Sequence, residues 1–333
     1  MLRRMINKSG RTILVVVSII LFGILLSYIS INELKPEDHS DYFPIGVDPS
    51  SKTIIENEQV YVYFPENDSG LEALALRSLG NIFSKIRQFS EPISIFINNE
   101  SLALVSGEKI VRITPGLRRE EVADKFAKAL GWKAEEKKSF LADEDVATSS
   151  LEEGMFVEGI YFVSKGTKQI DVKDMILKRF HSEVLSRYST STAEVVPIGM
   201  ALTVASLIQR ETIGTDDMRL VSGIIWNRIF TNMKLQLDRN LFQKRIYPAI
   251  DKNMKWWPQV NPKDKFINSP YNTYLHTGLP PAPIASPSVS AIVAALNPAQ
   301  TDCMFYFHDK KGNFNCSPTY EEHVVSLKKI YGQ

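Results

Sequence analysis

The first long hydrophobic segment of the chain lies close to its N-terminus. Residues 13–31 read ILVVVSIILFGILLSYISI and include no charged side chain. A helix rises by about 1.5 Å per residue, so a helix of this length crosses most of a hydrocarbon core about 30 Å thick. The pattern predicts a single transmembrane helix over residues 13–31.

The charges on either side of this segment predict its orientation. The residues before it are basic and those after it are acidic: Arg3, Arg4, Lys8 and Arg11, then Glu33, Glu37, Asp38 and Asp41. The positive-inside rule places residues 1–12 in the cytoplasm and everything beyond residue 31 outside. The alternative is a cleaved signal peptide, which has a shorter apolar region and needs small residues where Tyr28 and Ile29 stand. We therefore favour an uncleaved anchor in the cell (inner) membrane.

The next part of the chain predicts a tether followed by a small α+β module. Residues 32–51 are polar and contain three prolines, as expected of an extended tether. Residues 52–132 then alternate between strand and helix periodicity. The elements expected there are strands at 59–65, 93–97 and 110–113, a helix at 71–86, and a helix that buries Val122, Phe126 and Leu130.

A charged segment, residues 133–150, marks the predicted start of a second α+β domain over residues 133–333. We expect a strand within residues 152–166, a helix at 172–188, and a helix that starts at Pro197 and ends at Glu211. Thr215 is a candidate cap for the helix after it. Residues 233–287 show little periodicity but many Asn, Pro and Tyr residues, and irregular segments of this length in compact domains are usually functional.

Glu211 is an unusual end for a helix whose residues 198–208 are mostly apolar. A carboxylate at a helix C-terminus faces the negative end of the helix dipole. Water can tolerate that charge, and structural ion pairs place carboxylates in similar positions. The position makes Glu211 a candidate catalytic acid, and other motifs are needed to decide between a catalytic and a structural role.

Composition and missing motifs exclude several classes of protein. The formal net charge is +1, from 39 basic and 38 acidic residues, which lacks the basic footprint of a nucleic-acid binder. The chain contains no P-loop, dinucleotide-binding or nucleophile-elbow motif, so no cofactor is expected. The five histidines have no metal-ligand spacing, which predicts no metal site. Cys303 and Cys316 flank an expected hairpin outside the cytoplasm, where a disulfide is permitted, although the sequence leaves this pairing open.

Four motifs in the second half of the chain resemble those of the endolytic murein transglycosylases, the MltG or YceG-like family. They are ASLIQRET around Glu211, WNRIFTNMKLQLD with Asn227, Arg228, Gln236 and Asp238, SPYNTYLHTGLPPAPIASP, and SPTYEEH with Ser317, Thr319, Glu322 and His323. The resemblance extends from about Ile110 to the C-terminus. Departures from the family pattern occur at Glu158–Ile160, Leu237, Arg239, Ala282, Phe314 and Cys316, and none of them affects Glu211.

The resemblance implies cleavage of the β-1,4 bond between N-acetylmuramic acid and N-acetylglucosamine in nascent peptidoglycan strands, with 1,6-anhydro ends as product. Strand elongation would end at the cut, and peptidoglycan synthases are candidate partners. Glu211 is implied as the acid and then the base, because an intramolecular hydroxyl replaces water. The candidates for holding the sugars are Gln236, Asp238, Tyr271, Asn272 and Tyr274, with Ser206 behind Glu211. Loop scaffolding is an equal alternative for each of the first five. The module before residue 133 is implied to be LysM-like, with glycan binding left open.

Two other functions remain as alternatives. One is a glycan-binding scaffold of the cell-wall synthesis machinery that has lost catalysis. The other is a muramidase that uses water and needs a second essential carboxylate, for which Asp238 is the nearest candidate. The mass of the product distinguishes all three.

Overall fold

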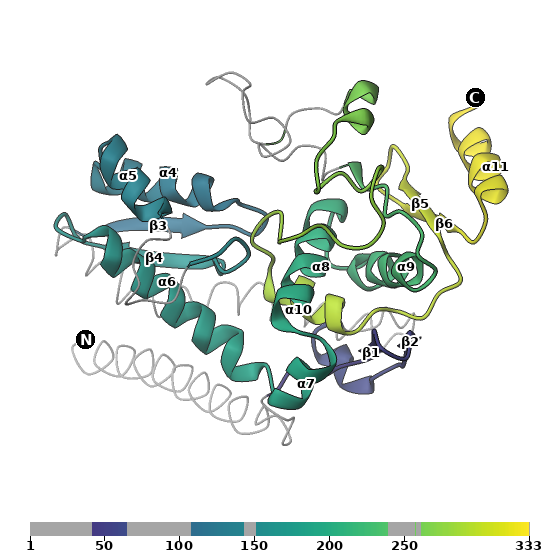
Figure 1. Ribbon diagram of the computed structural model, residues 1–333, viewed down its shortest axis with the longest axis horizontal. Coiled ribbons are helices and arrows are strands. Elements are labelled where there is room, and N and C mark those ends of the chain that lie inside the picture. The colour runs from purple at the N-terminus through teal and green to yellow at the C-terminus, as the bar shows by residue number, and fades with distance from the viewer. Residues whose placement is uncertain (1–41, 65–107, 143–150, 239–256, 258–260, 333) are drawn as a thin grey trace, which may run out of the picture. The chain divides into compact units, whose positions relative to one another are not determined.

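The structure, a computed structural model, describes residues 42–64, 108–142, 151–238, 257 and 261–332, which form an α+β fold (Figure 1). The predicted cytoplasmic tail and transmembrane helix, the predicted helix at 71–86 and the predicted strand at 93–97 lie outside these residues. Among the residues described, no helix has the length and apolar character that a membrane span requires.

The described chain begins with a segment that packs onto the larger core. Strands β1 (Val47–Asp48) and β2 (Thr53–Ile54) form a short antiparallel pair, followed by the 3-10 helix η1 (Glu58–Val62). Phe43 and Val47 are buried in the core, and the amide of Gly46 donates to the carbonyl of Leu296 over 2.9 Å. Residues 42–51 are therefore not the extended tether predicted, because their apolar side chains pack into the larger core. The strand predicted at 59–65 is also wrong, since residues 58–62 form η1.

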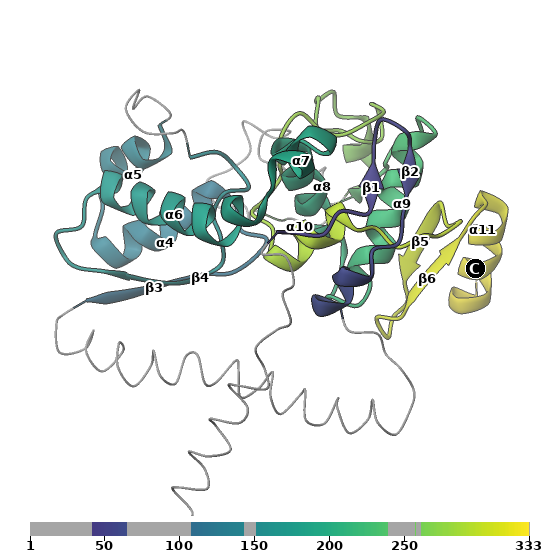
Figure 2. The same cartoon turned by 90° about the horizontal axis from the view of Figure 1, so that it is seen from below.

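A small unit of one sheet and three helices follows. Its elements are β3 (Lys109–Ile113), α4 (Arg119–Leu130), α5 (Ala134–Leu141), β4 (Gly159–Val163) and α6 (Gln169–Glu183). The strands pair antiparallel, with Val111 opposite Tyr161, and the three helices cover one face of the sheet (Figure 2). Val122, Phe126 and Ile176 are buried against that face. The predicted domain boundary between residues 132 and 133 therefore falls inside a single unit.

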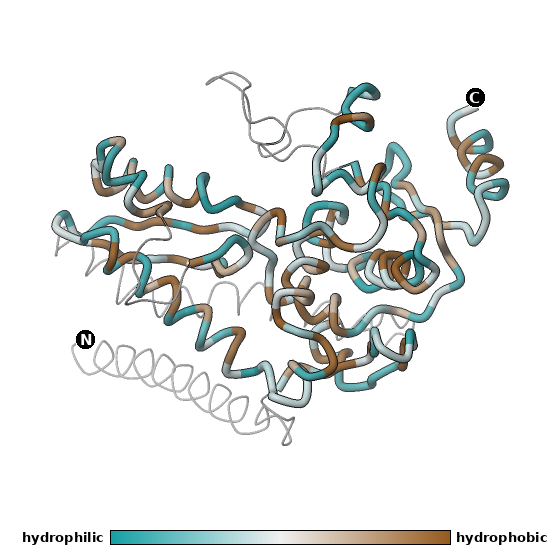
Figure 3. The backbone as a smooth tube through the Cα atoms, in the orientation of Figure 1, coloured by the Kyte–Doolittle hydropathy of each residue, from teal (hydrophilic) through white to brown (hydrophobic). Residues whose placement is uncertain are grey.

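The larger core is helical. It contains η3 (Leu185–Arg187), α7 (Thr190–Val195), α8 (Ile198–Glu211), α9 (Met218–Phe230) and α10 (Val289–Leu296). Hydrophobic residues concentrate along α8, α9 and α10 (Figure 3). The predicted end of α8 at Glu211 is confirmed, while Pro197 is its N-cap rather than its first residue. Asp217 rather than Thr215 precedes α9 as the N-cap, and its side chain makes no capping hydrogen bond.

The chain ends in a hairpin and a helix. Strands β5 (Phe305–His308) and β6 (Phe314–Ser317) pair antiparallel with Tyr306 opposite Cys316, as the expected hairpin requires. Cys303 and Cys316 form a disulfide, which answers the question that the sequence left open. Helix α11 (Tyr320–Tyr331) follows, and the Thr319 side chain caps it by accepting a hydrogen bond from the amide of Glu322.

Candidate active site

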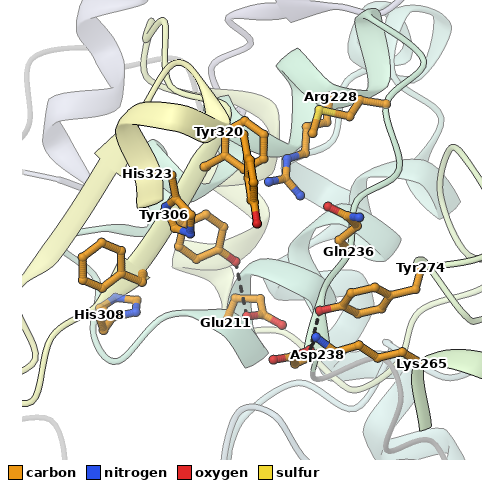
Figure 4. A pocket seen from close by; sticks show the side chains of 13 residues that line it. Glu211, Arg228, Gln236, Asp238, Lys265, Tyr274, Tyr306, His308, Tyr320 and His323 are labelled. Carbon is orange, nitrogen blue, oxygen red and sulfur yellow. Dashed lines mark hydrogen bonds and ion pairs between the residues drawn. The ribbon is translucent and has the colours of Figure 1, made fainter. Parts of the chain in front are cut away.

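An open cavity of about 790 Å³ lies where α8 ends, beside the hairpin β5–β6. The C-terminal part of α9, the start of α11 and two loops contribute the rest of its wall (Figure 4). Its polar lining consists of Glu211, Arg228, Gln236, Asp238, Lys265, Tyr274, Tyr306, His308 and His323, and its largest apolar surfaces are Phe305, Phe307 and Tyr320. Such a mixture of ionisable groups and aromatic rings suits a polar ligand with apolar faces.

Glu211 reaches this cavity from the last position of α8. Residues 201–208 of the helix are buried, Leu207 and Ile208 completely, which fixes the direction in which the helix ends. The Glu211 side chain itself is half-buried and faces the cavity. The phenol of Tyr306 donates a hydrogen bond of 3.2 Å to Oε2 of Glu211 (Figure 4). A partly exposed carboxyl group held by a rigid helix has the accessibility and the precision that acid–base catalysis requires.

Tyr306 is held by its strand and by the ring beneath it. It lies in β5 and stacks on Phe314 of β6, with the ring centroids 5.6 Å apart. Burial raises the pKa of Tyr306 well above its usual value, and the charge of Glu211 raises it further, against the opposing charge of Arg228. The phenol therefore keeps its proton and acts as a hydrogen-bond donor to Glu211.

Gln236 and Asp238 face the cavity, while the leucine that precedes each of them points into the core. Leu235 and Leu237 are buried, whereas Gln236 and Asp238 are exposed. Thr273 holds this segment in place: its carbonyl accepts from the amide of Gln236 at 3.1 Å, and its hydroxyl accepts from that of Leu237 at 3.0 Å. Gln236 has a φ of 51°, a left-handed conformation that non-glycine residues adopt mostly at constrained sites.

Tyr274 and Lys265 both bind Asp238. Lys265 belongs to the 3-10 helix η5 (Pro262–Phe266), and its Nζ lies 3.8 Å from Oδ1 of Asp238. The phenol of Tyr274 donates to the same oxygen. Burial and then the hydrogen bond to Asp238 raise the pKa of Tyr274 above its usual range, so this phenol is also a donor. The three predicted residues Gln236, Asp238 and Tyr274 thus lie together on the wall of the cavity that holds Glu211.

The other three predicted contact residues do not line the cavity. Asn272 is fully buried, and its side chain donates to the carbonyls of Lys265 and Ile267. Ser206 is also fully buried and accepts a hydrogen bond from the amide of Ile284. Tyr271 is only 6% exposed and belongs to the larger core. The sugar contact predicted for Asn272 is therefore corrected to scaffolding, because burial removes its polar atoms from any ligand. Ser206, predicted to lie behind Glu211, is a buried scaffolding residue as well.

Arg228 was not among the predicted contact residues, yet it connects two walls of the cavity. Its Nε donates to the carbonyl of Met304 at 2.7 Å, and its Nη1 donates to the carbonyl of Leu235. The first bond fixes the hairpin and the second fixes the loop that carries Gln236. The pattern of α9 held a signal for this role, since a charged residue follows Val221 and Ile225 at helical spacing on the buried face.

Tyr306, His308 and Lys265 were also missed. Tyr306 and His308 alternate with Phe305 and Phe307 in β5, so strand periodicity alone could have placed them on one face. His308 pairs with Asp217 beside the start of α9. Burial lowers the pKa of His323, with a smaller effect from the charge of Arg228, so its imidazole is neutral at pH 7. Within the described part of the chain, no group of three or more His, Cys, Asp or Glu side chains could hold a metal ion.

Comparison with known protein families shows to which family this chain is related. The model of the YceG-like family matches residues 94–329. The chain belongs to the YceG-like family. The resemblance drawn from the sequence motifs is confirmed, and the match includes every element that lines the cavity.

Relatives of this YceG-like chain are named endolytic murein transglycosylase. The protein of that name from Bacillus subtilis (strain 168) is 32% identical over 179 residues, which cover 54% of this chain and 48% of the relative. One from Streptococcus pneumoniae serotype 2 is 28% identical over 172 residues, 51% of this chain and 31% of the relative. The chain thus spans half or less of the length of these relatives.

The crystal structure of a putative yceG-like protein from Listeria monocytogenes has a similar fold, with a TM-score of 0.55. The two chains are 23% identical, and the similarity covers 65% of this chain and 75% of that one. At this level of identity the comparison supports the fold alone.

The cavity of this YceG-like chain can support acid–base chemistry on a large polar ligand. Glu211 supplies a carboxyl group that can give and take a proton, and Tyr306 holds it. Gln236, Asp238 and Lys265 supply amide, carboxylate and ammonium groups for ligand hydroxyl and carbonyl groups. Tyr320 exposes 61% of its surface at the rim, where a ring can pack against the face of a sugar.

Proposed function

We propose that this protein is an endolytic lytic transglycosylase that cleaves the β-1,4 bond between N-acetylmuramic acid and N-acetylglucosamine in nascent peptidoglycan. The observation that carries the proposal is the position of Glu211, at the end of a buried helix and open to a polar and aromatic cavity. Relatives with the name endolytic murein transglycosylase support the choice of substrate. Cleavage within a growing strand would terminate its elongation.

The proposed reaction uses Glu211 twice. The protonated carboxyl group first gives its proton to the glycosidic oxygen, so that the bond to C1 of the muramyl residue breaks and the N-acetylglucosamine hydroxyl leaves. The muramyl 6-hydroxyl then forms the new bond to C1, and the Glu211 carboxylate takes the hydroxyl proton. The proton balance closes without water, and the effective concentration of an intramolecular hydroxyl replaces that of a bound nucleophile.

Three side chains are proposed to hold the sugars, and the geometry supports them over the full set predicted from the sequence. Gln236, Asp238 and Tyr274 share the wall of the cavity with Glu211. Asp238 accepts a hydrogen bond from Tyr274, which orders its carboxylate for a sugar hydroxyl. Asn272 supports Tyr274 from below, because its side-chain oxygen accepts a hydrogen bond of 2.9 Å from the Tyr274 amide.

A muramidase that uses water is the second candidate, and the presence of Asp238 in the same cavity favours it. In such an enzyme two carboxyl groups act on the bond, and one of them activates water or attacks C1. The deciding experiment is digestion of intact peptidoglycan with the full chain in detergent, followed by mass spectrometry of the soluble products. We expect 1,6-anhydro ends; reducing ends, one water heavier, would establish the muramidase instead. Absence of cleavage would leave the glycan-binding scaffold.

We further propose that residues 13–31 anchor the protein in the cell membrane, with residues 1–12 in the cytoplasm and the cavity on the outer, periplasmic side. The support comes from the apolar length and from the flanking charges of the sequence. Peptidoglycan synthases are the proposed partners, because they supply nascent strands at that surface. An alkaline phosphatase fused after Gln333 should be active, whereas activity of a reporter that works only in the cytoplasm would overturn this topology.

A further inference from the structure

We infer that Tyr306 is a positioning residue for Glu211, and that the Cys303–Cys316 disulfide holds Tyr306 in its place. The inference rests on the proposed function, in which Glu211 gives and takes a proton. The acid comes from a helix, while the group that orients it comes from a hairpin whose second strand is bonded covalently to Cys303, two residues before its first strand.

The first step of the argument is the contact between the two side chains. Oη of Tyr306 lies 3.2 Å from Oε2 of Glu211, although the two residues are 95 positions apart in the chain. A glutamate side chain has three rotatable bonds, and Glu211 is only half-buried, so packing alone fixes its carboxyl group poorly. A hydrogen bond from a ring that cannot rotate away fixes the position of one carboxyl oxygen. The orientation of the whole group follows.

The second step concerns what holds the ring. A sheet of two strands is marginally stable by itself, and β5 and β6 form such a sheet. Tyr306 stacks on Phe314, and its partner in the register is Cys316, whose sulfur is bonded to that of Cys303. The covalent bond therefore joins the strand opposite Tyr306 to the residue that leads into β5.

The third step follows the disulfide to the core. Nδ2 of Asn227, on α9, donates to the carbonyls of Thr301 at 2.7 Å and Cys303 at 3.3 Å. One end of the disulfide is thus attached to a helix that packs beside α8. A continuous series of contacts then runs from Asn227 through the disulfide to Tyr306 and ends at the carboxyl group of Glu211. Loss of the disulfide would remove the covalent link between β6 and the residues that lead into β5, and would leave the register of β6 to its short ladder and its side-chain contacts.

The contact also has a chemical consequence. When Glu211 gives up its proton, the phenol of Tyr306 donates to the carboxylate that forms, and hydrogen bonds to charged groups are stronger than those to neutral groups. Removing the phenol oxygen should lower kcat by about ten- to a hundredfold, from loss of this bond and of orientation. The KM should change little, because the interaction strengthens after substrate has bound.

The first test is Tyr306→Phe in the full chain, assayed on peptidoglycan for kcat, KM and product mass. Without the hydrogen bond from Tyr306, the carboxylate form of Glu211 is less stable, so Glu211 stays protonated to higher pH. The alkaline limb of the pH–rate profile should therefore shift to higher pH. Other titratable groups around the cavity are present in both proteins and cancel in the comparison: Asp217, Arg228, Asp238, Lys265, Tyr274, His308 and His323. Tyr161→Phe is the matched control, because its buried phenol also donates a hydrogen bond, to the carbonyl of Val157 in the small sheet unit.

The second test is reduction of the disulfide by dithiothreitol, in which two electrons and two protons convert Cys303 and Cys316 to thiols and the reagent becomes a cyclic disulfide. Reduced wild type should lose kcat and show the same shift of the alkaline limb as Tyr306→Phe. In Tyr306→Phe itself, reduction should change the rate little, since a contact already lost cannot be lost again. The Cys303→Ser/Cys316→Ser variant should behave like the reduced protein. If Tyr306→Phe failed to fold, the profile of reduced wild type would carry the test.

The outcomes separate this inference from the proposed function. Wild type that yields no anhydro product would overturn the proposed function. Wild type that yields it, with Tyr306→Phe equal to Tyr161→Phe in kcat and in pH profile, would overturn only the role of Tyr306. Equal losses on reduction in wild type and in Tyr306→Phe would show that the disulfide acts independently of Tyr306, and would overturn the second half of the inference.

Discussion

The phenol of Tyr274 donates a hydrogen bond to the carboxylate of Asp238 and thereby joins two loops of the cavity wall. Lys265 approaches the same carboxylate oxygen at 3.8 Å and also lies over the ring of Tyr274, 4.5 Å from its centroid. Asp238 therefore accepts a hydrogen bond from Tyr274 and is the anion of an exposed ion pair with Lys265. Such an arrangement suits a residue that orients a sugar better than one that must attack or activate water.

Asp238→Asn is expected to lower activity by only about two- to fivefold, as for loss of an exposed ion pair. The amide oxygen can still accept from Tyr274, so the loops remain joined. The surviving product should keep its 1,6-anhydro end in mass spectra. A loss of about 10² or more, together with reducing-end product from wild type, would instead assign Asp238 to the chemistry of a water-using enzyme.

Glu211→Gln should reduce cleavage by about 10² to 10⁴, because the amide has nearly the same shape but has no proton to give. Its oxygen can still accept the hydrogen bond from Tyr306, so glycan binding and thermal stability should remain near those of wild type. Glu194→Gln, at an exposed position of α7, is the control for removing one negative charge. Turnover of Glu211→Gln within a few-fold of this control would exclude Glu211 as the acid.

Local patterns predicted the parts of the fold that depend on local sequence. The apolar run of α8, its end at Glu211 and the strand at β3 follow from periodicity, and the structure has them. The pairing of β3 with β4 could not be predicted in the same way, because each strand is short and their pairing depends on the helices that pack on one face of the sheet. A charged segment between the two strands therefore suggested a boundary where the structure has one unit.

The site shows the same limit. Gln236 and Asp238 alternate with leucines, a pattern that a sequence displays. Burial of Asn272 and Ser206 is a tertiary property, and polar residues near a motif look alike whether they face a ligand or a carbonyl. Tyr306 was missed because its partner, Glu211, lies on another element. The burial of Phe43 was missed because the segment around it is polar and contains prolines, and its sequence does not show that this one ring packs in the core.

Gly223→Ala should destabilise the fold by about 1–3 kcal/mol, the usual range for overpacking. A Cβ at this position of α9 would lie 2.3 Å from the carbonyl oxygen of Ala299, which is backbone and cannot rotate away. Gly199→Ala, in the first turn of α8, would meet nothing within 4 Å and should be neutral or up to about 1 kcal/mol more stable. Chemical denaturation of both variants checks the contrast. Equal stabilities of the two variants would mean that the backbone at residue 299 can move away from α9 without a cost in stability.

The last prediction concerns Glu153, a buried acid outside the cavity. Its side chain is 7% exposed and accepts hydrogen bonds from the amide of Arg119, the first residue of α4. Burial raises the pKa of Glu153 to about 8, with a smaller upward effect from Glu120 and an opposing one from the charge of Arg118. The folded protein therefore holds a proton on Glu153 at pH 7, whereas the unfolded chain, with the ordinary value of 4.5, does not.

The sign of the pH dependence follows from that difference. Below pH 4.5 both states are protonated, and the stability contributed by the raised pKa is fully present. Between pH 4.5 and about 8 only the unfolded state ionises, so this contribution falls by up to about 1.4 kcal/mol per pH unit, and above pH 8 it is lost. Glu153→Gln should therefore gain stability relative to wild type as pH rises from 5 to 8. The exposed Glu152→Gln, next to it in the chain, should show no such gain in parallel denaturation curves. A pH-independent difference between Glu153→Gln and wild type would mean that Glu153 is ionised in the folded protein and that the first turn of α4 stabilises its charge.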